Sequence, residues 1–501
     1  MAEDAAAAPE DHLESDRLIA ARLAKVESLR ADGVDPYPVR FERTATAAEI
    51  RDAHDGIEAG EAAGVEVTVA GRLRNVRDLG KLAFGVLQDW SGTIQLFADA
   101  ERLGDGFGEF TALDAGDWVG ASGEVMKTKR GELSVNLDRV ELLAKSLRPM
   151  PEKWHGLSDI ETRYRRRYVD LIVNEEARDV LQARVATIAS LRDTLEAHGF
   201  VAVETPTLHT VPSGGLATPF STHHNALDMD MYLRIALELH LKRLVVGGVE
   251  RVYEIGRVFR NEGVSPRHNP EFTMLELYQA FADYLDMAAI TEELVTTAAQ
   301  AVCGTTELSH RDRPLDLSSP WRRATYLEVL EEATGRSWGV DMPLADARRQ
   351  AADVDVEVDE SWTAGRIVVE AFEERAEDTL WDPTVVLDYP IEISPLARAH
   401  RDHPGLVERF EVIVAGTELA NAFSELNDPV EQRRRFEAQA EAKERGEAET
   451  HPMDEDFLVA LEHGMPPTGG MGMGVDRLVA LLTNQSSLRD VILFPHLRPE
   501  A

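Results

Sequence analysis

A predicted hairpin carries the densest set of chemically useful side chains. Two β-like runs, VYEIGRVFR and EFTMLELYQA, flank a loop rich in Asn, Gly, Pro and His. Because strand side chains alternate between faces, four residues of the second run must share one face. They are Phe272, Met274, Glu276 and Tyr278. A carboxylate between aromatic rings either faces solvent or receives a buried cation, and Arg260 beside it suits a phosphate group.

Four polar residues interrupt a second apolar stretch, RFEVIVAGTELANAFSELND. They are Glu411, Glu418, Asn421 and Glu425. An amphipathic edge strand would place them in solvent, but the surrounding residues leave few solvated positions. Carboxylates that flank a nucleotide typically hold Mg²⁺, which takes one or two protein carboxylates together with phosphate oxygens. The stretch therefore predicts either an exposed edge or a Mg²⁺ site.

A glycine-rich segment, GGMGMGVDRLVALL, forms the third candidate. A dinucleotide-binding G-x-G-x-x-G pattern is excluded because Val475 stands where its last glycine is needed. Glycines allow a backbone to approach a ligand closely, and the helix that follows would present its N-terminus and Arg477 to an anion such as a triphosphate. A plain glycine-rich turn with a surface arginine is the alternative. The chain contains no G-x-x-x-x-G-K-[ST] phosphate loop.

The elements that must position these residues follow a small β domain. Residues 15–31 have helical periodicity, and five short alternating runs between residues 65 and 145 predict a closed five-stranded barrel of the OB-fold type. Such barrels commonly bind single-stranded nucleic acid. Phe84 and Gln95 lie in its strands and suit stacking and base readout, although a lone Phe in a strand is more often part of the core.

Charge and composition limit the function classes. The 501 residues carry a net charge of −37, which opposes a polyanionic partner, but three basic clusters lie between residues 65 and 170 and favour local phosphate contacts. The clusters are Arg72, Arg74 and Arg77; Lys127, Lys129 and Arg130; and Arg163, Arg165, Arg166 and Arg167. Cys303 is the only cysteine, so no intrachain disulfide can form, and neither a signal peptide nor a membrane span is expected. We therefore expect a cytoplasmic protein.

The chain length predicts more than one domain. We expect a helix and lead-in over residues 1–64, the barrel over 65–145, a polar linker over 146–170 and a second domain over 171–501. Asn174 is expected to cap the first helix of that domain. The second domain alternates helices with strand pairs, which predicts an α+β fold with an antiparallel sheet flanked by helices.

Together the three candidate segments resemble the motifs of class II aminoacyl-tRNA synthetases, and the chain most resembles the bacterial lysyl-tRNA synthetase family. GFVAVETPTL resembles motif 1, FRNEGVSPRHNPEF motif 2 and GMGMGVDRL motif 3. The resemblance covers nearly the whole chain. It implies activation of L-lysine by ATP, transfer of lysine to tRNA(Lys), and a homodimer formed through the region of Pro206.

The resemblance also implies a role for each site residue. Arg260 and Arg477 would be catalytic, and both would bind ATP together with Glu262, His268, Asn269 and Phe272. Glu411 and Glu418 would be the Mg²⁺ ligands. The lysine pocket would comprise Gly214, Glu238, Glu276, Tyr278, Asn421 and Glu425. Arg77, Phe84 and Gln95 would read the anticodon.

Two alternatives remain from the sequence. An aspartyl- or asparaginyl-type synthetase shares the barrel and the three motifs, but the acidic pocket disfavours an acidic or neutral substrate. A catalytically inactive tRNA-binding paralogue is the second alternative. It is disfavoured because Arg260, Glu418 and Arg477 are all present, and a pure binding protein has no use for a triphosphate site.

Overall fold

In the computed structural model of the chain, five strands close into a barrel because buried and exposed residues alternate along them. The structure describes residues 9–151, 157, 159–212, 214–215, 217–360, 362–444 and 453–499. The strands are β1 (Ala62–Asp78), β2 (Leu82–Gln88), β3 (Thr93–Asp99), β4 (Trp118–Lys127) and β5 (Leu133–Ala144), in the order β1-β2-β3-β5-β4. Leu87 of β2 and Leu96 of β3 are among the side chains that fill the interior. The predicted five-stranded barrel is confirmed.

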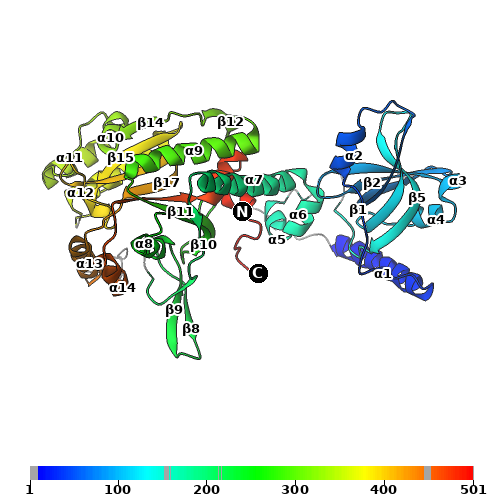
Figure 1. Cartoon of the computed structure of the whole chain (residues 1–501), viewed down its shortest axis with the longest axis horizontal. Coiled ribbons are helices and arrows are strands. Elements are labelled where there is room, and N and C mark those ends of the chain that lie inside the picture. The colour runs from blue at the N-terminus through cyan, green and yellow to red at the C-terminus, as the bar shows by residue number, and fades with distance from the viewer. Residues whose placement is uncertain are drawn as a thin grey trace. The chain divides into compact units, whose positions relative to one another are not determined.

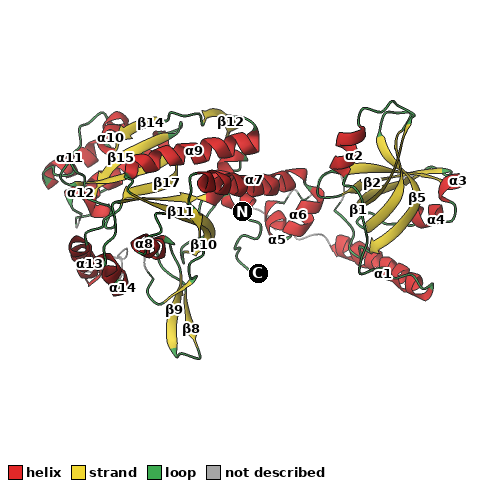
Figure 2. Ribbon diagram, in the orientation of Figure 1, coloured by secondary structure: helices red, strands yellow, loops and turns green. Residues whose placement is uncertain are grey.

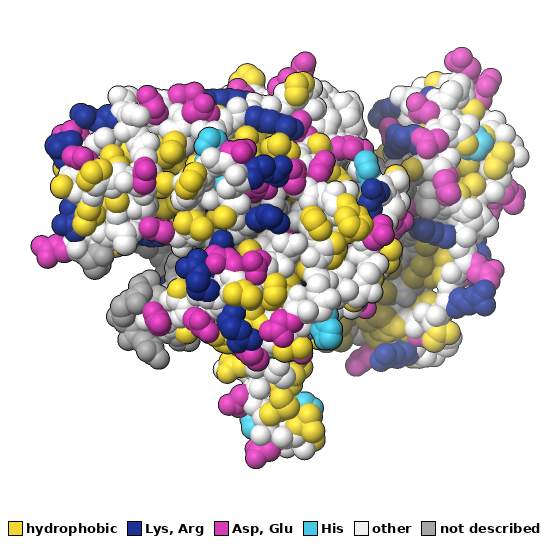
Figure 3. Space-filling view, turned by 60° about the vertical axis from the view of Figure 1, so that its left-hand side comes forward, with side chains coloured by type: hydrophobic (Ala, Val, Ile, Leu, Met, Phe, Trp, Pro, Cys, Tyr) yellow, Lys and Arg dark blue, Asp and Glu magenta, His cyan; other side chains and the backbone are white. Residues whose placement is uncertain are grey.

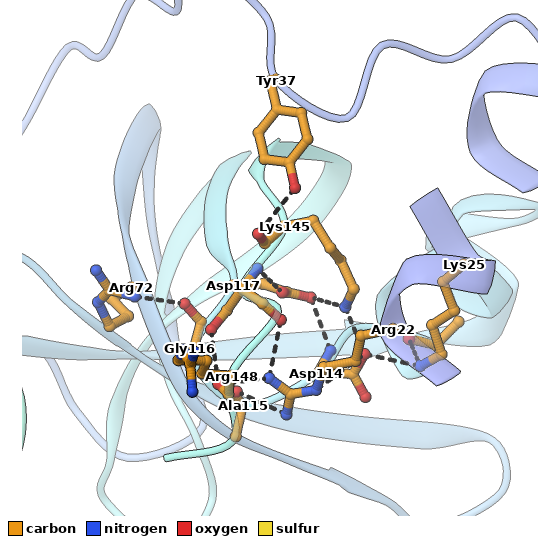
Figure 4. Close-up of polar contacts among 12 residues, drawn as sticks. Arg22, Lys25, Tyr37, Arg72, Asp114, Ala115, Gly116, Asp117, Lys145 and Arg148 are labelled. Atoms are coloured by element: carbon orange, nitrogen blue, oxygen red, sulfur yellow. Dashed lines mark hydrogen bonds and ion pairs between the residues drawn. The ribbon is translucent and has the colours of Figure 1, made fainter. Parts of the chain in front are cut away.

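A polar network fastens the N-terminal helix α1 (Pro9–Ala31) to this barrel (Figure 4). Arg22 donates to three backbone carbonyls of the barrel unit at 2.9 to 3.2 Å. Lys25 donates to Asp114 at 2.9 Å, and the buried Lys145 bridges Asp114 and Asp117. The helix starts earlier than the sequence predicts. Shorter helices α2 (Ala47–His54), α3 (Ala100–Leu103) and α4 (Gly106–Thr111) complete the unit, Met1–Gly156.

The second unit, Leu157–Ala501, is built on an eight-stranded sheet (Figure 1). In spatial order its strands are β14 (Arg322–Thr325), β15 (Thr384–Pro390), β16 (Leu406–Val414), β17 (Thr417–Ser424), β18 (Thr468–Gly474), β11 (Glu271–Ala280), β10 (Arg251–Phe259) and β6 (Val201–Ala202). The pairs β14/β15 and β10/β6 are parallel and the other pairs are antiparallel. The predicted antiparallel sheet flanked by helices is confirmed.

Helices cover one face of this sheet (Figure 2). They are α7 (Glu175–Ala197), α9 (Tyr284–Cys303) and α15 (Val475–Leu482). Leu275 and Leu277 of β11 pack into the core beneath these helices, so the residues between and beside them on β11 point to the opposite face. That opposite face carries the cavity described below.

The opposite face is flanked by two groups of helices. At the β14–β16 end lie α10 (Tyr326–Thr334), α11 (Leu344–Asp353), α12 (Ala364–Arg375) and the short η1 (Glu377–Thr379) and η2 (Ile391–Ile393). Near β10 and β11 lie α8 (Glu238–Val246), α13 (Pro429–Glu444) and α14 (Glu455–Glu462). The unit also contains α16 (Leu488–Val491) and the strand pair β12 (Glu307–His310) and β13 (Arg313–Asp316).

The expected linker over residues 146–170 contains helix in its second half, with α5 (Ile160–Arg165) and the start of α6 (Arg167–Val173). Three of the four arginines of the basic cluster there pair with carboxylates of the same unit. Arg163 and the buried Arg167 both bind Asp170, and Arg165 binds Glu161.

Asn174 occupies the position before α7 but makes no side-chain cap to it, contrary to the prediction. Its side-chain amide instead donates to Asp170 at 2.5 Å, which holds the side chain toward α6. Asp170 therefore binds Asn174 as well as the two arginines.

A three-stranded sheet ends in a hairpin that projects from the sheet unit (Figure 1). Its strands are β7 (Leu208–His209), β9 (Met229–Leu233) and β8 (Ser221–His224). Figure 3 shows the hairpin at the bottom, with histidine and acidic side chains near its tip, where His223 pairs with Asp228 and Asp230. Among the residues that the structure describes, no helix is long and apolar enough to cross a membrane.

Candidate active site and barrel surface

A cavity of about 700 Å³ opens on the face of the sheet opposite α7 and α9. It is lined by the β10–β11 hairpin, by β17 and β18, and by the start of α8. All but one of the site residues expected in the second domain line it: Gly214, Glu238, Arg260, Glu262, His268, Asn269, Phe272, Glu276, Tyr278, Glu418, Asn421, Glu425 and Arg477. The exception is Glu411, which lies beside a lining residue, Arg409.

The hairpin has the predicted register and faces the cavity. Strands β10 and β11 pair antiparallel, and Phe272, Met274, Glu276 and Tyr278 all line the cavity, so their shared face is confirmed. The solvent-facing alternative is wrong, since Glu276 is only 4% exposed. The guanidinium carbon of Arg260 lies 5.2 Å from the centroid of the Phe272 ring, which joins a cation to an aromatic platform.

Three buried carboxylates gather in one part of this cavity: Glu238, Glu276 and Glu425. Burial, followed by the charge of Glu238, raises the pKa of Glu276 to about 7. The backbone N–H of Leu237 and the hydroxyl of Tyr278 donate to its two oxygens at 3.0 and 3.3 Å.

Glu425 is the least satisfied of the three. Burial raises its pKa to about 8, although Lys242 acts in the opposite direction. Neither of its oxygens has a hydrogen-bond partner of good geometry in the part of the chain that the structure describes. Because buried charges must be paired, this group of carboxylates is suited to a cationic ligand.

Sequence reasoning missed Lys242, whose side chain is fully buried. Its ammonium lies 2.5 Å from an oxygen of Glu238 and 2.5 Å from an oxygen of Glu425. The run ELHLK contained the signal, because a Glu four residues before a Lys on a helix favours an ion pair.

The glycine-rich segment forms strand β18 and leads directly into α15. Gly470 is required at its position, because a Cβ there would lie 2.1 Å from Glu425 and 2.4 Å from Tyr278. The absence of a side chain at Gly470 leaves room for Glu425 and Tyr278 to lie against β18. Gly214 adopts a φ of +90° beside Glu238, a left-handed conformation that favours glycine.

Helix α15 presents Arg477 to the cavity, which excludes the plain surface arginine. Arg477 donates to the backbone carbonyl of Glu418 at 2.6 Å and to its carboxylate at 3.0 Å. The preceding Asp476 is buried, pairs with Arg184 and accepts from the backbone N–H of Thr273 at 2.7 Å. Asp476 therefore ties α15 to α7 and β11 and fixes the direction of Arg477.

Glu411 and Glu418 lie on the paired strands β16 and β17. Tyr389 donates to Glu411 at 3.1 Å, and Arg409 pairs with the same carboxylate. Burial raises the pKa of Glu411, whereas at Glu418 the same effect is outweighed by Arg477, Arg409 and Arg260, so that its pKa is lowered. Within the described residues, no three His, Cys, Asp or Glu side chains form a metal site.

The donor set nevertheless fits Mg²⁺ bound with a nucleotide, because that ion keeps several waters and takes only one or two protein carboxylates. Arg409 is a lining residue that sequence reasoning missed, and it also donates to Asn421 at 3.1 Å. Its position two residues before Glu411 was the signal, since residues i and i+2 of a strand share a face.

The loop between β10 and β11 brings the remaining expected residues to the cavity. Asn269 is buried, and its amide donates to the carbonyl of Glu271 at 2.6 Å while its oxygen accepts from the backbone of His496 at 3.2 Å. His268 and Ser265 form a hydrogen bond of 3.0 Å. Glu262 is exposed in the same loop.

The expected barrel residues share one outer face of the sheet. Arg77 is opposite Phe84 in the β1/β2 register, and Phe84 is opposite Phe97 in the β2/β3 register. The centroids of the two phenylalanine rings are 5.3 Å apart. Gln95 lies two residues before Phe97 and accepts from Ser134 at 2.9 Å. Since Phe84 alternates with the buried Ala83 and Gly85, it is not part of the barrel core.

Known protein families match both the sheet unit and the barrel. Residues 159–498 match the model of the class II tRNA synthetases (D, K and N), and residues 67–143 match the OB-fold nucleic acid binding domain. The chain is 52% identical to a lysine–tRNA ligase of Carboxydothermus hydrogenoformans, covering 98% of this chain and 99% of that protein. It is 50% identical to that of Bacillus subtilis, covering 97% and 98%. The chain therefore belongs to the lysine–tRNA ligases within the class II tRNA synthetase family.

Proposed function

We propose that this protein activates L-lysine with ATP and transfers it to tRNA(Lys), and that the cavity performs both steps. The observation that carries the proposal is the set of three buried carboxylates, Glu238, Glu276 and Glu425, in the same cavity as Arg260 and Arg477. In the first step a lysine carboxylate oxygen attacks the α-phosphorus of ATP and pyrophosphate leaves. In the second, a ribose hydroxyl at the 3′ end of the tRNA displaces AMP from the lysyl-adenylate.

The reaction needs positioning and charge neutralisation rather than a side-chain nucleophile. Arg260 binds the α-phosphate and the lysine carboxylate, and Arg477 binds the far end of the triphosphate. Phe272 stacks on the adenine, while Glu262, His268 and Asn269 contact the nucleotide. Glu411 and Glu418 would hold Mg²⁺, which when bound neutralises phosphate charge.

The acidic part of the cavity binds the substrate amino acid. Glu238 and the backbone beside Gly214 take its α-ammonium, and Asn421 takes its carboxylate. Glu425 takes the ε-ammonium, with support from Glu276 and Tyr278. An aspartyl- or asparaginyl-type reaction is disfavoured because the carboxylates would repel an acidic side chain and would remain uncompensated beside a neutral one.

The outer face of the barrel would read the anticodon. Phe84 supplies a stacking surface, Gln95 a hydrogen-bonding amide and Arg77 a positive charge, which are the groups that recognition of unpaired bases requires.

The protein would act as a cytoplasmic homodimer. Apolar side chains on α7 and on both sides of Pro206 support this assembly, since Val185, Val201 and Leu208 are 59%, 52% and 43% exposed. Sedimentation at micromolar concentration should show a dimer, and a monomer would contradict the assignment.

The activity is tested by pyrophosphate exchange in the presence of each of the twenty amino acids in turn. L-lysine should support exchange, and aspartate and asparagine should not. Exchange with aspartate or asparagine but not with lysine would show that the substrate is not lysine and would favour the aspartyl- or asparaginyl-type alternative. No exchange with any amino acid would favour the inactive tRNA-binding paralogue.

A further inference from the structure

Lys242 connects the two carboxylates that are proposed to bind the two ammonium groups of the substrate. It lies one helical turn after Glu238 on α8, and its ammonium also reaches Glu425, which follows β17. The Lys242 side chain is completely buried, and Tyr278 and Phe457 enclose it with ring centroids 5.9 and 6.0 Å from its nitrogen. One fixed cation therefore joins two separate walls of the cavity.

We propose that Lys242 is a positioning residue that sets the spacing between Glu238 and Glu425 and thereby selects lysine over diamino acids of other lengths. The inference rests on the lysine pocket proposed above. Lysine and ornithine carry the same two ammonium groups and differ by one methylene, so charge alone cannot separate them. A pocket of fixed length can distinguish lysine from ornithine.

The geometry excludes a purely local role for this ion pair. A lysine paired only with Glu238 would stabilise α8 and leave Glu425 free to turn. The same ammonium lies at 2.5 Å from both carboxylates, so movement of Glu425 toward a shorter ligand would break a buried ion pair. The pocket length is therefore coupled to the position of α8.

Lys242 also determines how readily Glu425 ionises. The charged and titratable groups that face Glu425 are Lys242 and Glu238 on α8, and Glu276 and Tyr278 on β11. On the neighbouring α14, the first-turn acid Asp456 and the preceding Asp454 are paired with Arg243. Lys242 is thus the cation that offsets the burial of Glu425 and the repulsion from Glu238 and Glu276.

The test compares Lys242→Met with the wild type in pyrophosphate exchange, using L-lysine and L-ornithine between pH 6 and pH 9. We expect the ratio of kcat/KM for lysine over ornithine to fall by about tenfold or more, which is the scale of one methylene. The acidic limb of the profile for lysine should move upward by about one pH unit, because Glu425 loses its counter-ion. Unchanged ratio and profile, or tighter lysine binding in the variant, would overturn the inference.

Two controls separate this role from stability. Lys145→Met removes a buried lysine that bridges two carboxylates in the barrel, and it should alter neither the ratio nor the profile. Lys242→Arg keeps the charge but holds the carboxylates at a different spacing, so it should preserve the profile and change the ratio. Lys242→Arg carries the test if Lys242→Met does not fold, and a wild-type ratio in it would overturn the spacing role.

The Glu425→Gln variant distinguishes the failure of this inference from the failure of the pocket itself. If Glu425→Gln activates lysine normally, the pocket assignment is wrong. If it is impaired while Lys242→Met behaves as wild type, the pocket assignment survives and Lys242 has no role in selection.

Discussion

Among the residues that the structure describes, two buried lysines each bridge two carboxylates, one in the barrel and one in the cavity, and their surroundings differ. Around Lys145, Asp117 also accepts from the backbone N–H groups of Asp114 and Ser146 at 2.8 and 2.9 Å. At Asp114, burial would raise the pKa, but hydrogen bonds from Lys145 and Lys25 outweigh it and lower the pKa. At Glu425, burial prevails over Lys242 and the pKa rises to about 8.

This comparison shows that similar ion pairs serve different purposes according to how completely they are satisfied. The barrel network is saturated and fastens α1 (Figure 4). In the cavity network, Lys242 forms an ion pair with Glu425, no hydrogen bond of good geometry from the described residues reaches the Glu425 oxygens, and a space of about 700 Å³ lies beside them. A saturated network stabilises a fold, whereas an unsaturated one beside a cavity is suited to a ligand.

The largest expected effect concerns the saturated network. Lys145→Met leaves Asp114 and Asp117 without their shared cation, so it should lower the free energy of unfolding of the barrel by about 3 to 5 kcal/mol. Hydrogen exchange at the backbone amides of the barrel strands, measured in urea, gives this loss. Lysine-dependent pyrophosphate exchange should stay at the wild-type rate under native conditions, and a comparable loss of exchange would contradict the division of roles.

The second prediction removes a charge from the cavity network by the substitution Glu425→Gln. The substitution keeps the shape and removes the charge, so kcat/KM for lysine in pyrophosphate exchange should fall by at least about a hundredfold, while the KM for ATP changes little. Glu276 can partly compensate, which is why the lower bound is modest. Activity within a few fold of wild type would show that the ε-ammonium binds elsewhere.

A smaller effect is expected on the outer face of the barrel. Phe84→Ala removes one stacking surface, so tRNA charging should weaken by about 1 to 3 kcal/mol while lysyl-adenylate formation is unchanged. The buried Phe110 offers a contrasting control, since its truncation should destabilise the barrel rather than act on tRNA alone. An equal loss of adenylate formation in Phe84→Ala would contradict the anticodon assignment.

Local periodicity was sufficient to predict the elements that carry the site. The alternation in EFTMLELYQA placed Glu276 and Tyr278 on one face, and the structure confirms that face. The hairpin and the glycine-rich strand are defined by residues close together in the chain, so their patterns are visible without tertiary information. Solvent exposure was not visible, because whether Glu276 is buried depends on α8 and on the strand β18, which pairs beside β11.

Side-chain pairing that a sequence pattern does not show explains two further differences. The charge pattern of the cluster around Arg167 did not show that Asp170 pairs with both Arg163 and Arg167. Lys242 escaped notice for the opposite reason. Its helical partner Glu238 is near in sequence, but Glu425, which makes the bridge informative, follows by more than a hundred residues and meets it only in the folded sheet unit.

The most direct test of the central claim counts the protons released when lysine binds. A carboxyl whose folded-state pKa is raised stays protonated until the pH exceeds that pKa, and with values of about 8 for Glu425 and about 7 for Glu276 the pocket is partly protonated at pH 7. A lysine ammonium pairs with the ionised form, so binding must expel a proton at neutral pH and not well above pH 8.

Isothermal titration calorimetry at pH 7, in buffers of different ionisation enthalpy, measures that number. The account predicts release of about one proton per lysine in the wild type and a clear reduction in Glu425→Gln. Tight lysine binding at pH 7 without proton release would contradict it.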